Sequence, residues 1–177
     1  MAVKTNNAPQ SFRYKFFNAK RLFNNFYSLS LYILILFFTA CDRNVVFEDN
    51  IKLHDNQWEQ KNIVTLKTDI TDTITPTNIY INIRNAGGYQ FSNLFVFLTT
   101  ETPSGEKERD TIEITLADAT GKWLGEGLGD IWDNRQLFKS NFRFPRKGIY
   151  TFYMEQAMRI DPLPQIMDAG IRIERAN

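Results

Sequence analysis

The sequence predicts an all-β protein: an antiparallel two-sheet β-sandwich of the jelly-roll or Ig-like type, preceded by a helical signal peptide. Three observations point to this class. Apolar and polar residues alternate with period two through most of the chain after residue 57, which is typical of half-buried strands. Clusters rich in Gly and Pro separate these runs and indicate turns. Helical periodicity is absent between the runs, so a sheet built from βαβ units is not expected.

The first 40 residues have the layout of an export signal. Their five charged residues are all basic, whereas the rest of the chain carries 16 bases against 20 acids. A mostly apolar run, 29–38, follows the bases. As a helix it would extend about 15 Å, half of the ~30 Å hydrocarbon core of a bilayer. A cleaved signal peptide is therefore favoured, and an uncleaved anchor is the alternative.

Cys41 is the only cysteine, and it directly follows the small residues Thr39 and Ala40. This arrangement resembles a lipobox, the site at which a lipoprotein signal peptide is removed after the cysteine is acylated. Phe38 departs from the usual leucine three residues before the cysteine. Because each buried CH₂ contributes ~0.8 kcal/mol, two or three acyl chains on Cys41 would give a stable membrane anchor. The alternative is an ordinary free or buried cysteine beside a generic signal.

The remaining chain is predicted to form one domain. Residues 41–56 are polar and irregular, and we expect a lipidated tether there; residues 57–177 are expected to form the β-sandwich. Strands are predicted around 64–70, 79–83, 94–98, 112–116, 138–144, 150–154 and 171–173. The run 94–98 is apolar on both faces, which suggests a central strand. The glycine-rich stretch 121–134 is expected to be a loop or short strand that wraps the core.

The sequence lacks the residues that several classes of function require. The net negative charge after residue 40 argues against nucleic acid binding. The single His54 lies in the expected tether, so a catalytic triad is not expected, and neither is a zinc site or any cofactor. Two acidic pairs could offer oxygen ligands to calcium, but turn capping by these aspartates is favoured. These pairs are Asp69 with Asp72 and Asp130 with Asp133.

Two groups of residues are candidates for contact with a ligand or partner. Trp58, Trp123 and Trp132 could form a platform for sugar rings, although tryptophan is more often a core or rim residue. The segment 155–159 ends a predicted strand with polar side chains, among them Glu155, Gln156 and Arg159. These could either brace the turn at 161–164 or face a partner, and the sequence leaves both readings open.

A set of short motifs is spread over nearly the whole chain, and its most specific part is the Glu-Gln-Ala-Met-Arg segment 155–159. The set comprises Cys41-Asp42, Asn44, Val46-Phe47-Glu48, Trp58, Arg84-Asn85, Tyr89, Asn93-Leu94, Asp110-Thr111-Ile112-Glu113, Gly121-Lys122-Trp123, Gly125, Gly127, Gly148-Ile149-Tyr150, Glu155-Gln156-Ala157-Met158-Arg159 and Gly170-Ile171-Arg172-Ile173. On these residues the chain resembles the GldH-type gliding motility lipoproteins of the Bacteroidota.

The resemblance implies an envelope lipoprotein without enzymatic activity that is required for gliding, a movement linked to type IX secretion. Protein partners in that apparatus are therefore expected, together with the membrane contact made through Cys41. Surface-exposed lipoproteins of this phylum usually carry several acids directly after the cysteine, whereas Asp42 is followed here by Arg43-Asn44. We therefore expect a domain that is anchored in the outer membrane to face the periplasm from its inner leaflet. Exposed edge strands would be natural docking sites for a partner. The alternative function is a carbohydrate-binding envelope lipoprotein.

Overall fold

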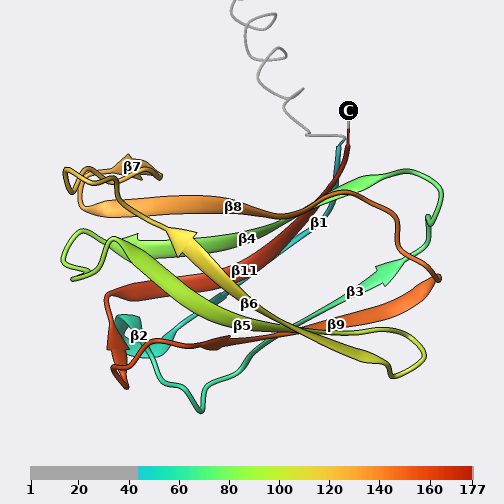
Figure 1. Cartoon of the computed structure of the whole chain (residues 1–177), viewed down its shortest axis with the longest axis horizontal. Helices are drawn as coiled ribbons and strands as arrows, with labels where there is room; N and C mark the ends of the chain where they lie inside the picture. Colours follow the sequence, from blue (N-terminus) through green and yellow to red (C-terminus); the bar gives the residue numbers. More distant parts are fainter. Residues whose placement is uncertain (1–43, 177) are drawn as a thin grey trace, which may run out of the picture. The chain divides into compact units, whose positions relative to one another are not determined.

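The structure is a computed structural model that describes residues 44–176, and in them two antiparallel sheets pack face to face (Figure 1). The chain divides into two compact units, Met1–Asp42 and Arg43–Asn177, and the sandwich belongs to the second. The predicted lipobox and its Cys41 lie outside the described residues. In the part of the chain that the structure describes, no helix is long and apolar enough to cross a membrane.

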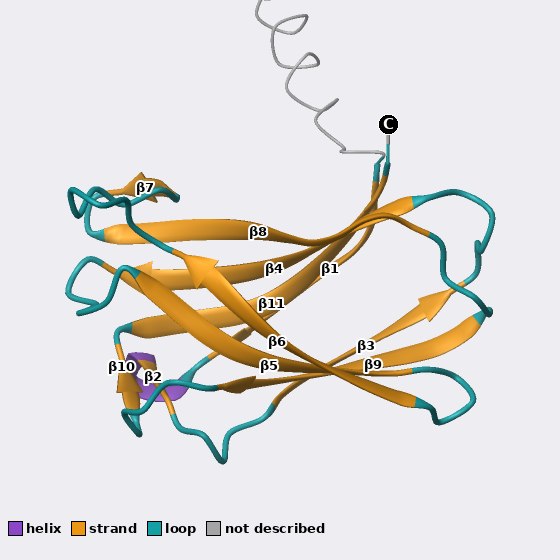
Figure 2. Ribbon diagram, viewed as in Figure 1, coloured by secondary structure: helices purple, strands orange, loops and turns teal. Residues whose placement is uncertain are grey.

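Each sheet joins strands that are distant in the sequence (Figure 2). The five-stranded sheet has the order β1 (Val45–Lys52), β11 (Ile166–Arg175), β4 (Thr77–Ala86), β8 (Ile131–Phe142) and β7 (Glu126–Leu128). The four-stranded sheet has the order β3 (Val64–Ile70), β9 (Gly148–Gln156), β5 (Asn93–Glu101) and β6 (Lys107–Thr115). A small ribbon pairs β2 (Gln57–Trp58) with β10 (Leu163–Pro164), next to the short 3₁₀ turn η1 (His54–Asn56).

The core lies between the two sheets and is built by the alternation seen in the sequence. Strand β4 buries Ile79, Ile81 and Ile83, while its intervening residues face outward. Strands of the other sheet contribute a second apolar layer in the same way. This layer includes Val64, Leu66, Leu94, Val96, Leu98, Phe152 and Met154. The prediction of an all-β, two-sheet sandwich is confirmed.

The prediction of an irregular tether is wrong for residues 45–52, because they form the edge strand β1. This strand pairs with β11 from Val45 opposite Glu174 to Lys52 opposite Asp168. Most of its side chains are exposed, although Phe47 packs partly buried against the core. Hydrogen bonds of the backbone to β11 are therefore the main interactions that hold the strand in the sheet. A period-two apolar pattern is therefore weak there. The sandwich begins at β1 and not at residue 57.

The glycine-rich stretch 121–134 contains the short strand expected there, β7, and also the first residues of β8. Only two residues, Gly129 and Asp130, separate the strands, and Gly129 has a φ of +69°, which favours glycine. The segment 124–130, which includes β7, is called the arm, and a bridge between Ala117 and Trp123 fixes its base next to the end of β6.

The register of the strands defines two ends of the sandwich. At one end, called the entry end, the Arg175 backbone N–H donates to the carbonyl of Asn44 at 2.8 Å, and Arg175 is level with Thr77 and Phe142. At the opposite end, called the far end, Ala86 is level with Ile131. Strand β4 has 10 residues and rises about 3.3 Å per residue, so the two ends are roughly 30 Å apart.

Candidate functional site: a polar groove on the five-stranded sheet

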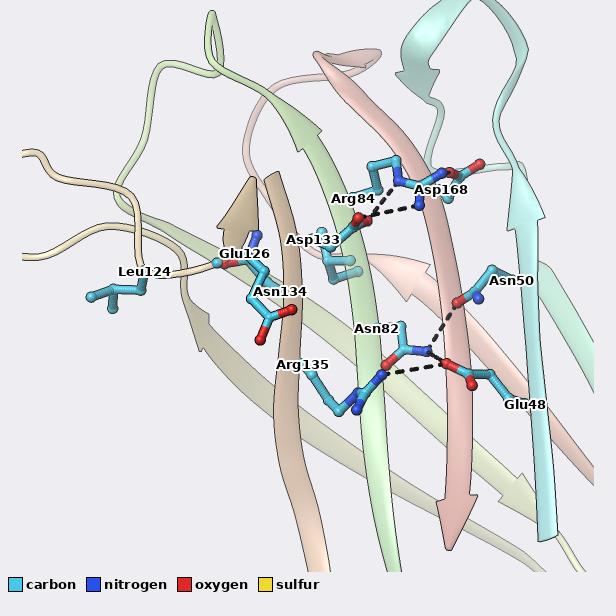
Figure 3. Close-up of a pocket in the computed structure, with 12 residues that line it drawn as sticks. Glu48, Asn50, Asn82, Arg84, Leu124, Glu126, Asp133, Asn134, Arg135 and Asp168 are labelled. Atoms are coloured by element: carbon cyan, nitrogen blue, oxygen red, sulfur yellow. Dashed lines mark hydrogen bonds and ion pairs between the residues drawn. The ribbon is translucent and has the colours of Figure 1, made fainter. Parts of the chain in front are cut away.

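The outer face of the five-stranded sheet carries a dense set of polar and charged side chains. The register places Asn50, Gly170, Asn82 and Arg135 in one row across β1, β11, β4 and β8. The next row toward the far end contains Asp168, Arg84 and Asp133. Together with Glu48 and residues Leu124–Glu126 of the arm, the side chains of these two rows line a concavity of about 520 Å³, called the polar groove (Figure 3).

Arg84 joins three strands at the far end of the polar groove. Its Nε donates to Asp133 Oδ1 at 2.6 Å and its Nη1 donates to Asp168 Oδ2 at 3.0 Å. The hydrogen bond to Asp133 is the main cause of a raised pKa for the Arg84 guanidinium. The Arg84 side chain is nonetheless 44% exposed, so this planar donor group remains accessible to a partner from the solvent side.

A glycine opens the centre of the polar groove. Because Gly170 has no side chain, the Asn50 amide crosses β11, and Asn82 Nδ2 donates to Asn50 Oδ1 at 3.1 Å. A Cβ at position 170 would lie 2.1 Å from Asn50 Oδ1 and 2.3 Å from the Asp49 carbonyl oxygen. Any larger residue would therefore displace β1. Asn82 Oδ1 is itself enclosed and accepts no hydrogen bond from the residues that the structure describes.

An ionic cluster closes the polar groove on the entry side. Arg172 is buried, and its guanidinium contacts both Glu48 and Glu174. Glu48 also accepts from Asn82 Nδ2 at 3.1 Å and lies 3.6 Å from Arg135 Nη2. These contacts join β1, β11 and β8. Removal of one charged member would leave its partner uncompensated, so the cluster favours a fixed relative position of the three strands.

The arm that forms one wall of the polar groove depends on two glycines. A Cβ at Gly125 would lie 2.6 Å from the Asp133 carbonyl oxygen, and a Cβ at Gly127 would lie 2.4 Å from the Trp132 ring. The arm can therefore approach β8 only with glycine at these positions. It leaves Leu124, which lines the groove, 56% exposed and Leu128, which does not line it, 92% exposed, so one apolar side chain adjoins the polar floor.

The chemistry of the polar groove suits recognition. Its floor presents guanidinium, amide and carboxylate groups that already satisfy one another in part, and none of the residues that line it is His, Cys or Ser.

A second, mainly apolar cavity of about 310 Å³ lies between the sheets under Phe138, Phe142 and Phe144. There Lys139 Nζ on β8 contacts Glu108 Oε2 on β6 at 3.0 Å and links the two sheets.

The three tryptophans do not form a shared platform. Trp58 has no exposed surface, and its Nε1 donates to the Asn62 carbonyl at 3.0 Å inside the fold. Its assignment as a contact residue is wrong, because β2 and β10 enclose the indole at one end of the core. Trp123 is partly buried against the core, and Trp132 is partly exposed with its ring over Gly127.

The segment 155–159 separates into residues with different roles. Gln156 is 2% exposed: its Nε2 donates to the Ile160 carbonyl at 3.0 Å, and its Oε1 accepts from the Met158 N–H at 2.8 Å. It braces the turn, so its assignment as a surface contact is wrong. Glu155 binds Arg109 at 2.9 Å on the outer face of the other sheet. Arg159 is exposed at the far end.

The residues considered for catalysis and metal binding serve local structure. The His54 side chain is 91% exposed and contacts Asp55. Asp72 accepts from the Ile74 and Thr75 N–H groups, and the hydrogen bonds of this turn, that of the Thr75 side chain first, lower its pKa to about 2. Within residues 44–176, no group of three His, Cys, Asp or Glu residues could hold a metal ion.

Sequence reasoning missed the polar groove as a site. The available signal was the outward phase of β4, where Tyr80, Asn82 and Arg84 alternate with buried isoleucines. That phase predicts which side chains share a face, but it does not predict which strands lie beside β4. Glu48 and Asp168 are far from Arg84 in the sequence and reach this face only through the pairing of β1 with β11 and of β11 with β4.

In comparisons with known proteins, the matching family model and the two curated relatives all carry the same family description. A family model described as GldH lipoprotein matches residues 45–173. The chain is 32% identical over 159 residues to a "Gliding motility lipoprotein GldH homolog" of Christiangramia forsetii, covering 85% of this chain and 97% of that protein. It is 33% identical over 154 residues to the "Gliding motility lipoprotein GldH" of Flavobacterium johnsoniae, covering 83% and 94% of the two chains.

Among solved structures, a subviral particle of infectious bursal disease virus VP2 is similar with a TM-score of 0.32 and 14% identity. The match covers 75% of this chain and 32% of the viral chain. A likeness of this size supports no argument about function.

Proposed function

Because this chain belongs to the GldH lipoprotein family, we propose that it is a non-catalytic, lipid-anchored envelope protein that supports gliding motility. The observation that carries the proposal is the extent of the family match. Residues 45–173 include all of β1 and nearly all of β11, so the match covers the sandwich and is not confined to a signal peptide. The two relatives, one named as gliding motility lipoprotein GldH and the other as a homolog of it, match over 94% and 97% of their own lengths.

The proposed anchor is a set of acyl chains on Cys41. Cys41 precedes Asn44 by three residues, which span at most about 10 Å when fully extended. Acylation there would hold the entry end of the sandwich close to the membrane. The proposed anchor lies in the outer membrane. The domain is proposed to face the periplasm, because the acidic cluster that surface-exposed lipoproteins of this phylum usually carry after the cysteine does not follow Cys41.

The anchor is tested by Cys41→Ser. This variant is expected to lose palmitate labelling and to move from the membrane fraction to the soluble fraction. A mature protein that still incorporates palmitate after the substitution would refute the assignment. Protease treatment of intact cells tests the orientation: a domain that faces the periplasm is protected until the outer membrane is opened, whereas ready digestion in intact cells contradicts it.

We propose that the polar groove contacts a protein of the gliding or type IX secretion apparatus and supports its assembly. Paired charges of both signs on a rigid sheet favour a partner of complementary polar surface, and the exposed Leu124 supplies an apolar contact at the wall of the groove. Arg84 is suited to the centre of the contact, since a half-exposed guanidinium can bind a partner carboxylate or carbonyl without leaving Asp133.

The test compares a clean deletion with two charge-reversal variants expressed at normal levels. The deletion is expected to abolish colony spreading, and Arg84→Glu is expected to reduce it strongly. Arg109→Glu is the matched control, because Arg109 is also paired with a carboxylate and is 49% exposed, against 44% for Arg84, but lies on the other sheet. A deletion strain that glides and secretes normally would refute the proposed function.

A further inference from the structure

The entry end of the sandwich has a composition that distinguishes it from the far end. The loop that connects β8 to β9 contains Arg143, Arg146 and Lys147 within five residues and has no acid. The Arg143 Nε donates to the Ile74 carbonyl at 3.1 Å, so this loop is tied to the neighbouring connection between β3 and β4. Arg146 and Lys147 are exposed, and their charges face solvent.

The two ends of the domain carry opposite net charge. The entry-end loops contain three bases and two acids; these loops are 71–76, 102–106 and 143–147. The far-end segments contain three bases and six acids; these segments are 53–63, 87–92, 116–130 and 157–165. The domain is therefore electrically polarised along the strands, with the positive end at the point where the chain enters from residue 44.

Apolar side chains accompany the bases at the entry end. Ile74, in the loop bound by Arg143, is 82% exposed, and Ile149, two residues after Lys147, is 59% exposed. Neither side chain contributes to the core. A set of bases beside exposed aliphatic side chains is the composition of a protein surface that rests on the headgroup region of an anionic bilayer. We call Ile74, Arg143, Arg146, Lys147 and Ile149 the basic entry face.

We infer that the basic entry face lies directly on the anionic phospholipid surface to which the protein is anchored. The inference rests on the proposed anchor at Cys41, which brings this end of the sandwich, and not the far end, to the membrane. The attachment point and the sign of the charge agree: a tether that enters at Asn44 holds the positive end against negative headgroups. The negative far end and its projecting arm, with Leu128, then point away from the bilayer.

The contact between the basic entry face and the lipid orients the domain as well as holding it at the membrane. One point of attachment does not fix the orientation of a domain, whereas a second contact of bases and isoleucines fixes the strands at a steep angle to the membrane. The polar groove, which runs along the five-stranded sheet toward the far end, is then presented to components beyond the bilayer surface. Arg175 adds a further base at the same end, close enough to Asp72 for a coulombic interaction.

The lipid contact can be measured without the anchor, because the core residues, from Leu53 to Ile173, lie within the compact unit Arg43–Asn177. The mature chain with Cys41→Ser is mixed with phosphatidylcholine vesicles that contain about one third phosphatidylglycerol, at about 0.1 M salt, where the Debye length is about 10 Å. Binding is followed by sedimentation. Binding is expected on the mixed vesicles and is expected to be much weaker on pure phosphatidylcholine.

Matched double variants identify the face that binds. Arg146→Gln with Lys147→Gln is expected to lower the partition coefficient about 25-fold, roughly fivefold for each base removed near an anionic surface. Lys122→Gln with Arg159→Gln makes the same change of charge at the far end and is expected to leave the coefficient unchanged. Equal losses in both double variants, or equal binding to neutral vesicles, would overturn the inference.

A local probe gives a second, independent readout. Since Cys41 is the only cysteine, Ile74→Cys in the Cys41→Ser chain can carry one environment-sensitive fluorophore, and Leu128→Cys supplies the far-end control. A blue shift on mixed vesicles is expected for the probe at position 74 alone. A shift at position 128 instead would overturn the inference. Because none of these measurements uses lipidation, a failure here is distinguishable from a failure of the Cys41 assignment in cells.

Discussion

Gln156→Leu is predicted to destabilise the domain although it replaces a polar side chain by an apolar one of similar size in a buried position. Gln156 ends β9, opposite Val96 of β5. Its amide serves the backbone on both sides of the following turn, accepting from the Met158 N–H and donating to the Ile160 carbonyl. Leucine can make neither hydrogen bond, so two backbone groups of the turn lose their partners.

The magnitude follows from those two groups. Each hydrogen bond contributes about 1 kcal/mol net, and a buried backbone group without a partner costs roughly 1–3 kcal/mol. The turn is only partly buried, and leucine buries more apolar surface than glutamine, so we expect a loss of about 2–3 kcal/mol. With an m-value of about 2 kcal/mol/M for a domain of this size, the urea midpoint should fall by roughly 1 M.

The assay is equilibrium urea unfolding followed by intrinsic fluorescence, with Glu155→Gln as the control from the same segment. Glu155 lies on the outer face, where its carboxylate, a quarter exposed, pairs with Arg109. Loss of such a surface ion pair costs below about 1 kcal/mol, so this midpoint should move by less than half as much. A Gln156→Leu protein with an unchanged midpoint would refute the view that this amide braces the turn.

Three further predictions follow from the same contacts. Gly127→Val should destabilise the arm by about 1–3 kcal/mol, because its Cβ would lie 2.4 Å from the Trp132 ring; a lowered urea midpoint together with a changed Trp132 emission checks it. Trp58→Ala should lower the free energy of unfolding by about 3–5 kcal/mol, since the indole is fully buried, and an unaltered melting curve would contradict this. Asp72 has a pKa lowered from 3.8 to about 2, so it stabilises the fold above the unfolded pKa and loses this contribution as the pH falls through the folded pKa. Asp72→Asn should therefore flatten the dependence of the urea midpoint on pH between about pH 5 and pH 2, and an unchanged slope would count against the turn as its cause.

Much of the fold could be predicted from the sequence because strand β4 and its neighbours bury one face each. The alternation of Ile79, Ile81 and Ile83 with polar residues specifies both the strand and the side that faces the core. Strand β1 escaped prediction for the opposite reason. It is an edge strand with mostly exposed side chains, and the backbone hydrogen bonds that hold it leave no trace in hydrophobic periodicity.

The site residues show the same division. The sequence singled out Trp58 and Gln156 by residue type, yet both are buried and serve the fold. The outward phase of β4 marked Arg84 as a surface residue, but its partners Asp133 and Asp168 come from strands 49 and 84 positions away in the sequence. No local pattern can predict such a meeting, because it depends on which strands become neighbours.

The sequence by itself determined the class of fold and the family of the protein, because these depend on local periodicity and motif; the export signal that its charge pattern indicates stays a prediction. Only the tertiary structure decided that residues 45–52 complete the sheet, that Gly170 opens the polar groove for Asn50, and that Ile74 and Lys147 share the end at which the chain enters. These outcomes depend on strand order and register, which are set by the packing of the two sheets as a whole.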